Sequence, residues 1–157
     1  MNRTHNDIAE KVREQVCVHL NQLLADAADL SMQTKQAHWA LRGPNFIALH
    51  KLFDDVHDHC GEWTDSLAER VAALGGQPLG TLQAAAAATR LEKYPVELVV
   101  DRQHAERIAL ALARFGAFVR KAIDDFAKQG DADSADLATE ISREVDKDLW
   151  FVEAHLG

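Results

Sequence analysis

The sequence has few residues that cross-link a chain, and it has no long apolar run. Only two cysteines occur in 157 residues and no signal-peptide pattern opens the chain, so we expect free thiols in a cytoplasmic protein. No apolar stretch approaches the length of a membrane span. Apolar residues nevertheless make up 47% of the chain, which excludes disorder by composition. We assign residues 1–157 to one domain, with residues 1–6 as a short polar tail.

Positive charge is also scarce. The chain carries 17 Lys and Arg against 25 Asp and Glu, a formal net charge of −8. Residues 1–6 contain one Arg and one His, and no basic extension follows the last helical pattern. Because binding by counterion release needs clustered positive charge, we expect weak or no DNA binding at neutral pH, with nucleoid association as the alternative. An acidic surface is compatible with attracting cations.

The most informative stretch runs from Asn45 to Leu74. It contains no proline, and its apolar residues recur at the spacing of an amphipathic helix. On such a helix His50, Asp54, Asp65 and Glu69 lie at about 0°, 40°, 60° and 100° around the axis, so all four share one stripe. Acidic residues and histidines on one stripe often form a solvated face, and a single His-x3-Asp pair would be read that way.

The register of the two pairs favours a metal site instead. Asp54 and Asp65 are separated by about 16 Å of helix rise, too far for one ion whose ligand bonds are about 2 Å long. In a second, antiparallel copy with a two-fold axis midway between the pairs, His50 faces the partner's Glu69. Asp54 then faces the partner's Asp65. Such self-complementarity is what a two-fold interface requires, and it predicts two identical sites about 22 Å apart.

A second histidine joins this site through a helical hairpin. Arg42, Gly43 and Pro44 break the helical pattern, and His38 and His50 each lie six residues from Pro44. Residues equidistant from the turn of an antiparallel hairpin lie level with each other. The predicted ligands are therefore two imidazoles and three carboxylates, which suit iron, with zinc or manganese as competitors.

Three segments make the chain resemble the Dps family of mini-ferritins, the DNA-binding proteins from starved cells. They are KQAHWALRGPNFIALHKLFDDV (35–56), TDSLAERVAALGG (64–76) and DKDLWFVEAHL (146–156). The resemblance covers essentially the whole chain. It implies a ferritin-like subunit, a hollow homo-dodecamer, and oxidation of Fe(II) between two-fold-related chains. It further implies hydrogen peroxide as the preferred oxidant and ferric mineral stored inside the shell, protecting against oxidative stress.

The family's ferroxidase ligands carry over without substitution. They correspond to His38, His50, Asp54, Asp65 and Glu69. The resemblance also implies three-fold pores near the start of the last helix, lined by carboxylates that draw Fe(II) inward. Asp136 and Glu140, an i,i+4 pair, are the pore candidates, although carboxylates at a helix N-terminus also stabilise the helix dipole.

The remaining pattern predicts an all-α fold, a ferritin-like four-helix bundle with a short extra helix in the crossover between the second and third long helices. Asp7 and Glu10 resemble a capping box, which would start the first helix at Asp7. The four long helices are expected at about 7–41, 45–74, 96–128 and 134–155. The crossover, from Gly75 to Pro95, carries the alanine-rich segment TLQAAAAATRL.

Three other functions fit the sequence less well than an iron-oxidising shell. A nucleoid-compacting protein would need the clustered positive charge that is missing here. An ordinary ferritin with a di-iron site inside one bundle needs Glu-x2-His motifs on facing helices, and the sequence has none. A zinc hydrolase would need a nucleophile or general base beside the ligands, and none accompanies them.

Overall fold

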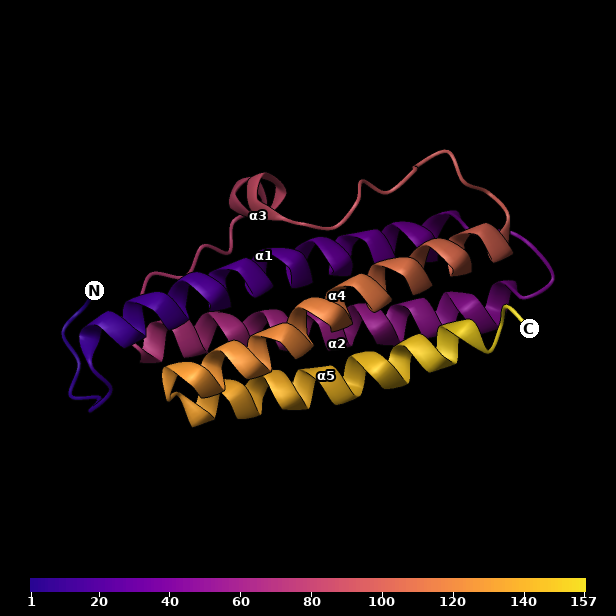
Figure 1. Ribbon diagram of the computed structural model, residues 1–157. Helices are drawn as coiled ribbons and strands as arrows, with labels where there is room; N and C mark the ends of the chain where they lie inside the picture. The colour runs from indigo at the N-terminus through magenta and orange to yellow at the C-terminus, as the bar shows by residue number, and fades with distance from the viewer.

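Four long helices lie side by side as a bundle in the computed structural model, which describes residues 1–157 (Figure 1). The chain has five helices and no strand: α1 Glu10–Ala40, α2 Phe46–Ala73, α3 Leu82–Ala88, α4 Asp101–Gln129 and α5 Ala132–Glu153. The short α3 lies in the crossover between α2 and α4, outside the bundle and beside α1. The all-α architecture and the extra crossover helix are therefore confirmed. None of the helices is long and apolar enough to cross a membrane.

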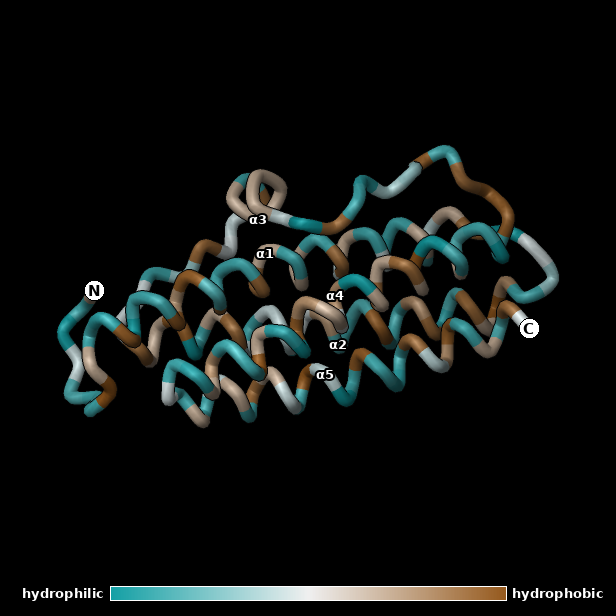
Figure 2. The backbone as a smooth tube through the Cα atoms, viewed as in Figure 1, coloured by the Kyte–Doolittle hydropathy of each residue, from teal (hydrophilic) through white to brown (hydrophobic).

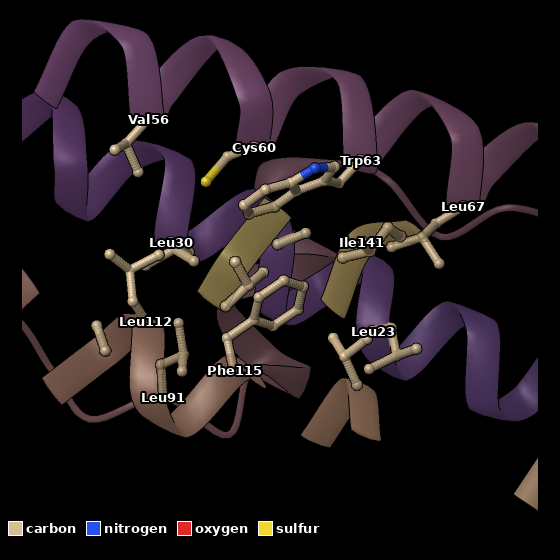
Figure 3. Close-up of a cluster of buried hydrophobic side chains, with 14 of the residues drawn as sticks. Leu23, Leu30, Val56, Cys60, Trp63, Leu67, Leu91, Leu112, Phe115 and Ile141 are labelled. Carbon is tan, nitrogen blue, oxygen red and sulfur yellow. The ribbon is translucent and has the colours of Figure 1, made fainter. Parts of the chain in front are cut away.

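The core forms because each long helix turns one apolar stripe inward, while hydrophilic residues alternate with it along the helix (Figure 2). Figure 3 shows the middle of this core, where Trp63 of α2 lies above Phe115 of α4. Their ring centroids are 5.8 Å apart. Leu23 and Leu30 of α1 and Ile141 of α5 close the same cluster. The interior of the bundle is thus apolar at its centre.

The starts of all four long helices differ by one to five residues from the sequence expectation. The predicted capping box of Asp7 and Glu10 does not form, because α1 begins only at Glu10 and no side chain caps it. The α2 helix begins after Asn45, whose side chain makes no capping bond. The α5 helix begins at Ala132, two residues early, because the Asp131 carboxylate accepts the Ser134 backbone N–H at 3.1 Å.

The largest difference is at α4, which begins at Asp101 instead of residue 96. The backbone just before it pairs with the α1–α2 loop: the Arg42 N–H donates to the Val99 carbonyl at 2.8 Å. The Asp101 N–H donates in turn to the Arg42 carbonyl at 2.9 Å. The backbone at Val99 and Asp101 therefore bonds to a neighbouring loop where a first helical turn was expected.

Side chains of α1 tie the crossover to the bundle. Gln22 donates to the Ala88 carbonyl at 2.8 Å, at the end of α3. The buried Asp26 accepts from both the backbone and the guanidinium of Arg90. Gln33 donates to the Glu92 carbonyl at 3.1 Å. Because these bonds recur along α1, the long connection follows that helix over most of its length.

Candidate metal centre

Two stacked imidazoles form the centre of the candidate site. His38 near the end of α1 and His50 near the start of α2 have ring centroids 3.7 Å apart, with an interplanar angle of 20°. Each ring also bonds to the other residue's backbone: His38 Nδ1 lies 2.7 Å from the His50 carbonyl oxygen, and His50 Nδ1 lies 2.9 Å from that of His38. The level placement expected from the distance to Pro44 is confirmed.

These reciprocal bonds determine the chemistry available to both rings. A carbonyl oxygen can only accept a hydrogen bond, so each Nδ1 must carry a proton. In the neutral imidazole the other ring nitrogen, Nε2, then keeps its lone pair. A histidine that ligates a metal is usually oriented by such a bond at its second nitrogen. His38 and His50 are thus both held in the tautomer that can ligate a cation through Nε2.

Asp54 brings a carboxylate to the two imidazoles. It lies one turn after His50 on α2, and its Oδ1 is 3.9 Å from His38 Nδ1. The same oxygen contacts the ammonium of Lys35 on α1, whose hydrogen bond lowers the pKa of Asp54. Lys35 was not among the residues selected from the sequence. Its position one turn before His38 was the available signal, since residues three apart share a helix face.

Asp65 and Glu69 are both exposed on α2, about four and five turns along the helix from His50. Nowhere in this chain do three or more histidine, cysteine or acidic side chains gather in an arrangement that could hold a metal ion. Within one copy, His38, His50 and Asp54 lie near one another without forming a complete site, and Asp65 and Glu69 lie farther along α2. Their common role as ligands stays a prediction.

A second polar cluster joins α2 to α5. His59 Nδ1 lies 2.9 Å from the buried carboxylate of Asp148, and the indole N–H of Trp63 donates to Glu144 at 2.6 Å. Although burial favours the neutral imidazole, the bond to Asp148 raises the pKa of His59. Burial also raises the pKa of Asp148. These contacts satisfy polar groups between two helices, and they too were not foreseen from the sequence.

The predicted pore residues lie on the first half of α5. Asp136 and Glu140 are both exposed there, one turn apart. The preceding Asp131 has a structural role, because it is buried, caps α5 and accepts from the Arg70 guanidinium at 2.6 Å. A role of Asp136 and Glu140 in ion entry stays a prediction.

The bundle, its long crossover between the second and third long helices, and the histidines and carboxylates on α1 and α2 define a ferritin-like protein. A family profile described as a ferritin-like domain matches residues 17–157. The chain is 42% identical over 154 residues to a DNA protection during starvation protein of Agrobacterium fabrum, covering 98% of this chain and 95% of that protein.

Solved structures give the same result. The tetragonal form of Mycobacterium smegmatis Dps matches with a TM-score of 0.94 at 31% identity, covering 99% of this chain and 94% of that one. Dps from Microbacterium arborescens in the high iron form matches with a TM-score of 0.88 at 33% identity, covering 98% and 97%. The chain belongs to the Dps family.

Proposed function

We propose that this protein oxidises Fe(II) at sites shared between two-fold-related copies and stores the ferric product in a hollow shell. The observation that carries the proposal is the His38–His50 pair, whose two Nε2 atoms are left free and whose His38 ring lies close to Asp54, but which lacks further ligands within the chain. Membership of a ferritin-like family supports iron storage in general terms.

The missing ligands are supplied by a second copy in this proposal. Antiparallel pairing of α2 places the partner's Glu69 opposite His50 and the partner's Asp65 opposite Asp54. Both carboxylates are exposed in the single chain and therefore available to a neighbour. Two such sites, about 22 Å apart, would follow from each two-fold contact. A dodecamer built from these pairs is the assembly that the family resemblance implies.

The donor set suits Fe(II) as a substrate that is oxidised in place. Hydrogen peroxide accepts one electron from each of two Fe(II) ions. With two protons taken from solution, it is reduced to two water molecules. Carboxylates favour the more highly charged ferric product, while neutral imidazoles suit Fe(II). Delivering both electrons at one place avoids release of a hydroxyl radical. Zinc and manganese suit the same donors and are expected to compete.

The direct test is anaerobic loading with Fe(II), followed by hydrogen peroxide, with ferric absorbance and consumed peroxide recorded. Wild type should consume about one peroxide per two Fe(II) and keep the product soluble, and Glu69→Ala should slow oxidation at least about tenfold. Asp55→Ala is the matched control, because Asp55 is an exposed carboxylate of α2 away from the ligand stripe. If wild type matched a protein-free solution, the ligand set would be inert toward iron.

DNA protection enters the proposal through iron removal. Relatives carry the name DNA protection during starvation protein, but this chain has a net charge of −8. We therefore expect a supercoiled plasmid to be spared from nicking by Fe(II) and peroxide without being retarded in a gel at low salt. Strong retardation that survives removal of residues 1–6 would show that the folded surface itself binds DNA.

A further inference from the structure

The candidate site already contains a cation of the protein's own. The Lys35 ammonium on α1 contacts Oδ1 of Asp54 on α2. The Lys35 side chain is only 22% exposed, while that of Asp54 is 45% exposed. His38 Nδ1 lies 3.9 Å from the same Asp54 oxygen. The positive charge therefore sits among the groups proposed to bind iron.

This ion pair is poorly explained as a support for the helical hairpin. His38 and His50 already join α1 to α2 through two hydrogen bonds to backbone carbonyls. An ion pair with a half-exposed carboxylate adds little to stability, because solvent screens the two charges. Its evident effect is electrostatic, because an ammonium on Asp54 opposes any second cation that approaches the same oxygen.

We propose that Lys35 is an internal counter-cation that competes with the metal for Asp54. The inference rests on the proposed inter-chain iron site. When the site is empty, the ammonium neutralises Asp54; when Fe(II) binds, the lysine swings away on its flexible four-carbon stem, and it returns as iron leaves. Lys35 thereby lowers affinity, so that iron passes through the site toward the store.

A storage protein has a physical need for such a group. The completed site has three carboxylates, from Asp54 and from the partner's Asp65 and Glu69. They attract Fe(III) more strongly than Fe(II), because Fe(III) carries the higher charge. A site that held Fe(III) firmly would stop after one turnover. A positive charge that returns to Asp54 favours release of the product and prepares the site for another Fe(II).

The test compares Lys35→Met, which removes the charge and keeps the length, with Lys35→Arg, which keeps the charge. Co(II) binding is measured by calorimetry without oxidant, so that affinity is read separately from turnover. We expect Lys35→Met to bind Co(II) about tenfold more tightly and Lys35→Arg to remain close to wild type. Lys11→Met, at an exposed lysine in the first turns of α1, is the control and should change nothing.

Repeated Fe(II) additions give the second measurement. Lys35→Met should oxidise the first addition about as fast as wild type and slow down on later ones, because the ferric product stays at the site. Unchanged or weaker Co(II) binding in Lys35→Met, or equal effects of Met and Arg, would overturn the proposal. Circular dichroism and native mass spectrometry are the controls that each variant folds and assembles as wild type does.

Glu69→Ala distinguishes failure of this inference from failure of the inter-chain site. If Glu69→Ala weakens Co(II) binding while Lys35→Met leaves it unchanged, the site stands and the role of Lys35 is wrong. If Glu69→Ala binds Co(II) as wild type does, the inter-chain site is wrong and the role of Lys35 falls with it.

Discussion

At the scale of single residues, some buried polar side chains of this protein take their partners from a distant segment of the chain. Asp26 of α1 is completely buried and accepts three hydrogen bonds from Arg90 in the crossover, one from its backbone and two from its guanidinium. The guanidinium also lies 3.8 Å above the centroid of the Phe118 ring. Arg90 thus joins the crossover to α1 and α4 at once.

Removing the Arg90 guanidinium should lower the free energy of unfolding more than removing an exposed guanidinium does. Arg90→Met leaves the buried Asp26 carboxylate with only a backbone N–H, so we expect a loss of about 2 kcal/mol, moderated by the partial exposure of Arg90. Arg120→Met, which breaks an exposed pair with Asp146, should cost less than about 1 kcal/mol. Urea unfolding followed by circular dichroism compares the two, and equal losses would contradict the asymmetry.

A second buried residue should make stability depend on pH. His104 is fully buried, with Nδ1 2.6 Å from the Tyr94 hydroxyl, and burial lowers the pKa of His104 below its ordinary value of 6.5. Burial likewise raises the pKa of the Tyr94 hydroxyl. Below pH 6.5 this histidine is protonated in the unfolded chain but stays neutral in the folded protein. It therefore lowers the free energy of unfolding as the pH falls.

The measurement is the free energy of unfolding of wild type and His104→Gln at several pH values from 8 to 5. Wild type should lose more stability than the variant as the pH falls, because only wild type carries the buried imidazole. Other titrating groups, including His59, are common to both proteins and cancel in the difference. Parallel curves would mean that His104 is protonated as easily in the fold as in the unfolded chain.

At the scale of elements, the α1–α2 hairpin is the part that positions the candidate site. Its loop packs tightly on the start of α4: a Cβ added at Gly43 would overlap the carboxylate of Asp101. That carboxylate is buried and accepts the backbone N–H groups of Asn45 at 2.8 Å and Arg102 at 2.7 Å. The glycine is therefore needed for close approach between the loop and α4.

Gly43→Ala should accordingly disturb both fold and site. We expect the overlap to lower the free energy of unfolding by about 1–3 kcal/mol. We also expect weaker Co(II) binding, since His38 and His50 lie near this end of the hairpin. Gly80→Ala is a suitable comparison, because the nearest atom to its added Cβ is 4.0 Å away. Calorimetry and urea unfolding give both quantities; a Gly43→Ala protein as stable as Gly80→Ala would show that the loop yields easily.

At the scale of the whole molecule, the proposed site is complete only when two copies meet. His50→Ala damages one half of each proposed site and Glu69→Ala damages the other. When the two variants are unfolded together and reassembled, about one quarter of the sites should combine two intact halves, if the copies pair at random. Peroxide-dependent Fe(II) oxidation by the mixture should therefore recover to about that fraction of wild type.

The same experiment contains its own control. Each variant reassembled alone has no site with two intact halves and should stay slow. A mixture no faster than its components, with native mass showing that mixed assemblies formed, would place all the ligands within one chain.

Much of the fold followed from the sequence because its signals are local. The inward stripes, with the breaks at Arg42–Pro44, at Gly75–Pro95 and at Gly130, predicted four long helices and a crossover, and the structure has them. Helix starts were harder. Residues 96–100 were expected to be helical, but the backbone at Val99 and Asp101 bonds to Arg42. No local sequence pattern indicates a partner more than fifty residues away.

The sequence by itself determined the helical register of the candidate ligands, because helix geometry converts spacing directly into position. His38 could be placed beside His50 by counting from Pro44, and the stacked rings agree. Only the tertiary structure decided which ring nitrogen of each histidine is free, and that Lys35 rests on Asp54. Those facts depend on how two helices turn toward each other, which side-chain packing sets and residue spacing does not record.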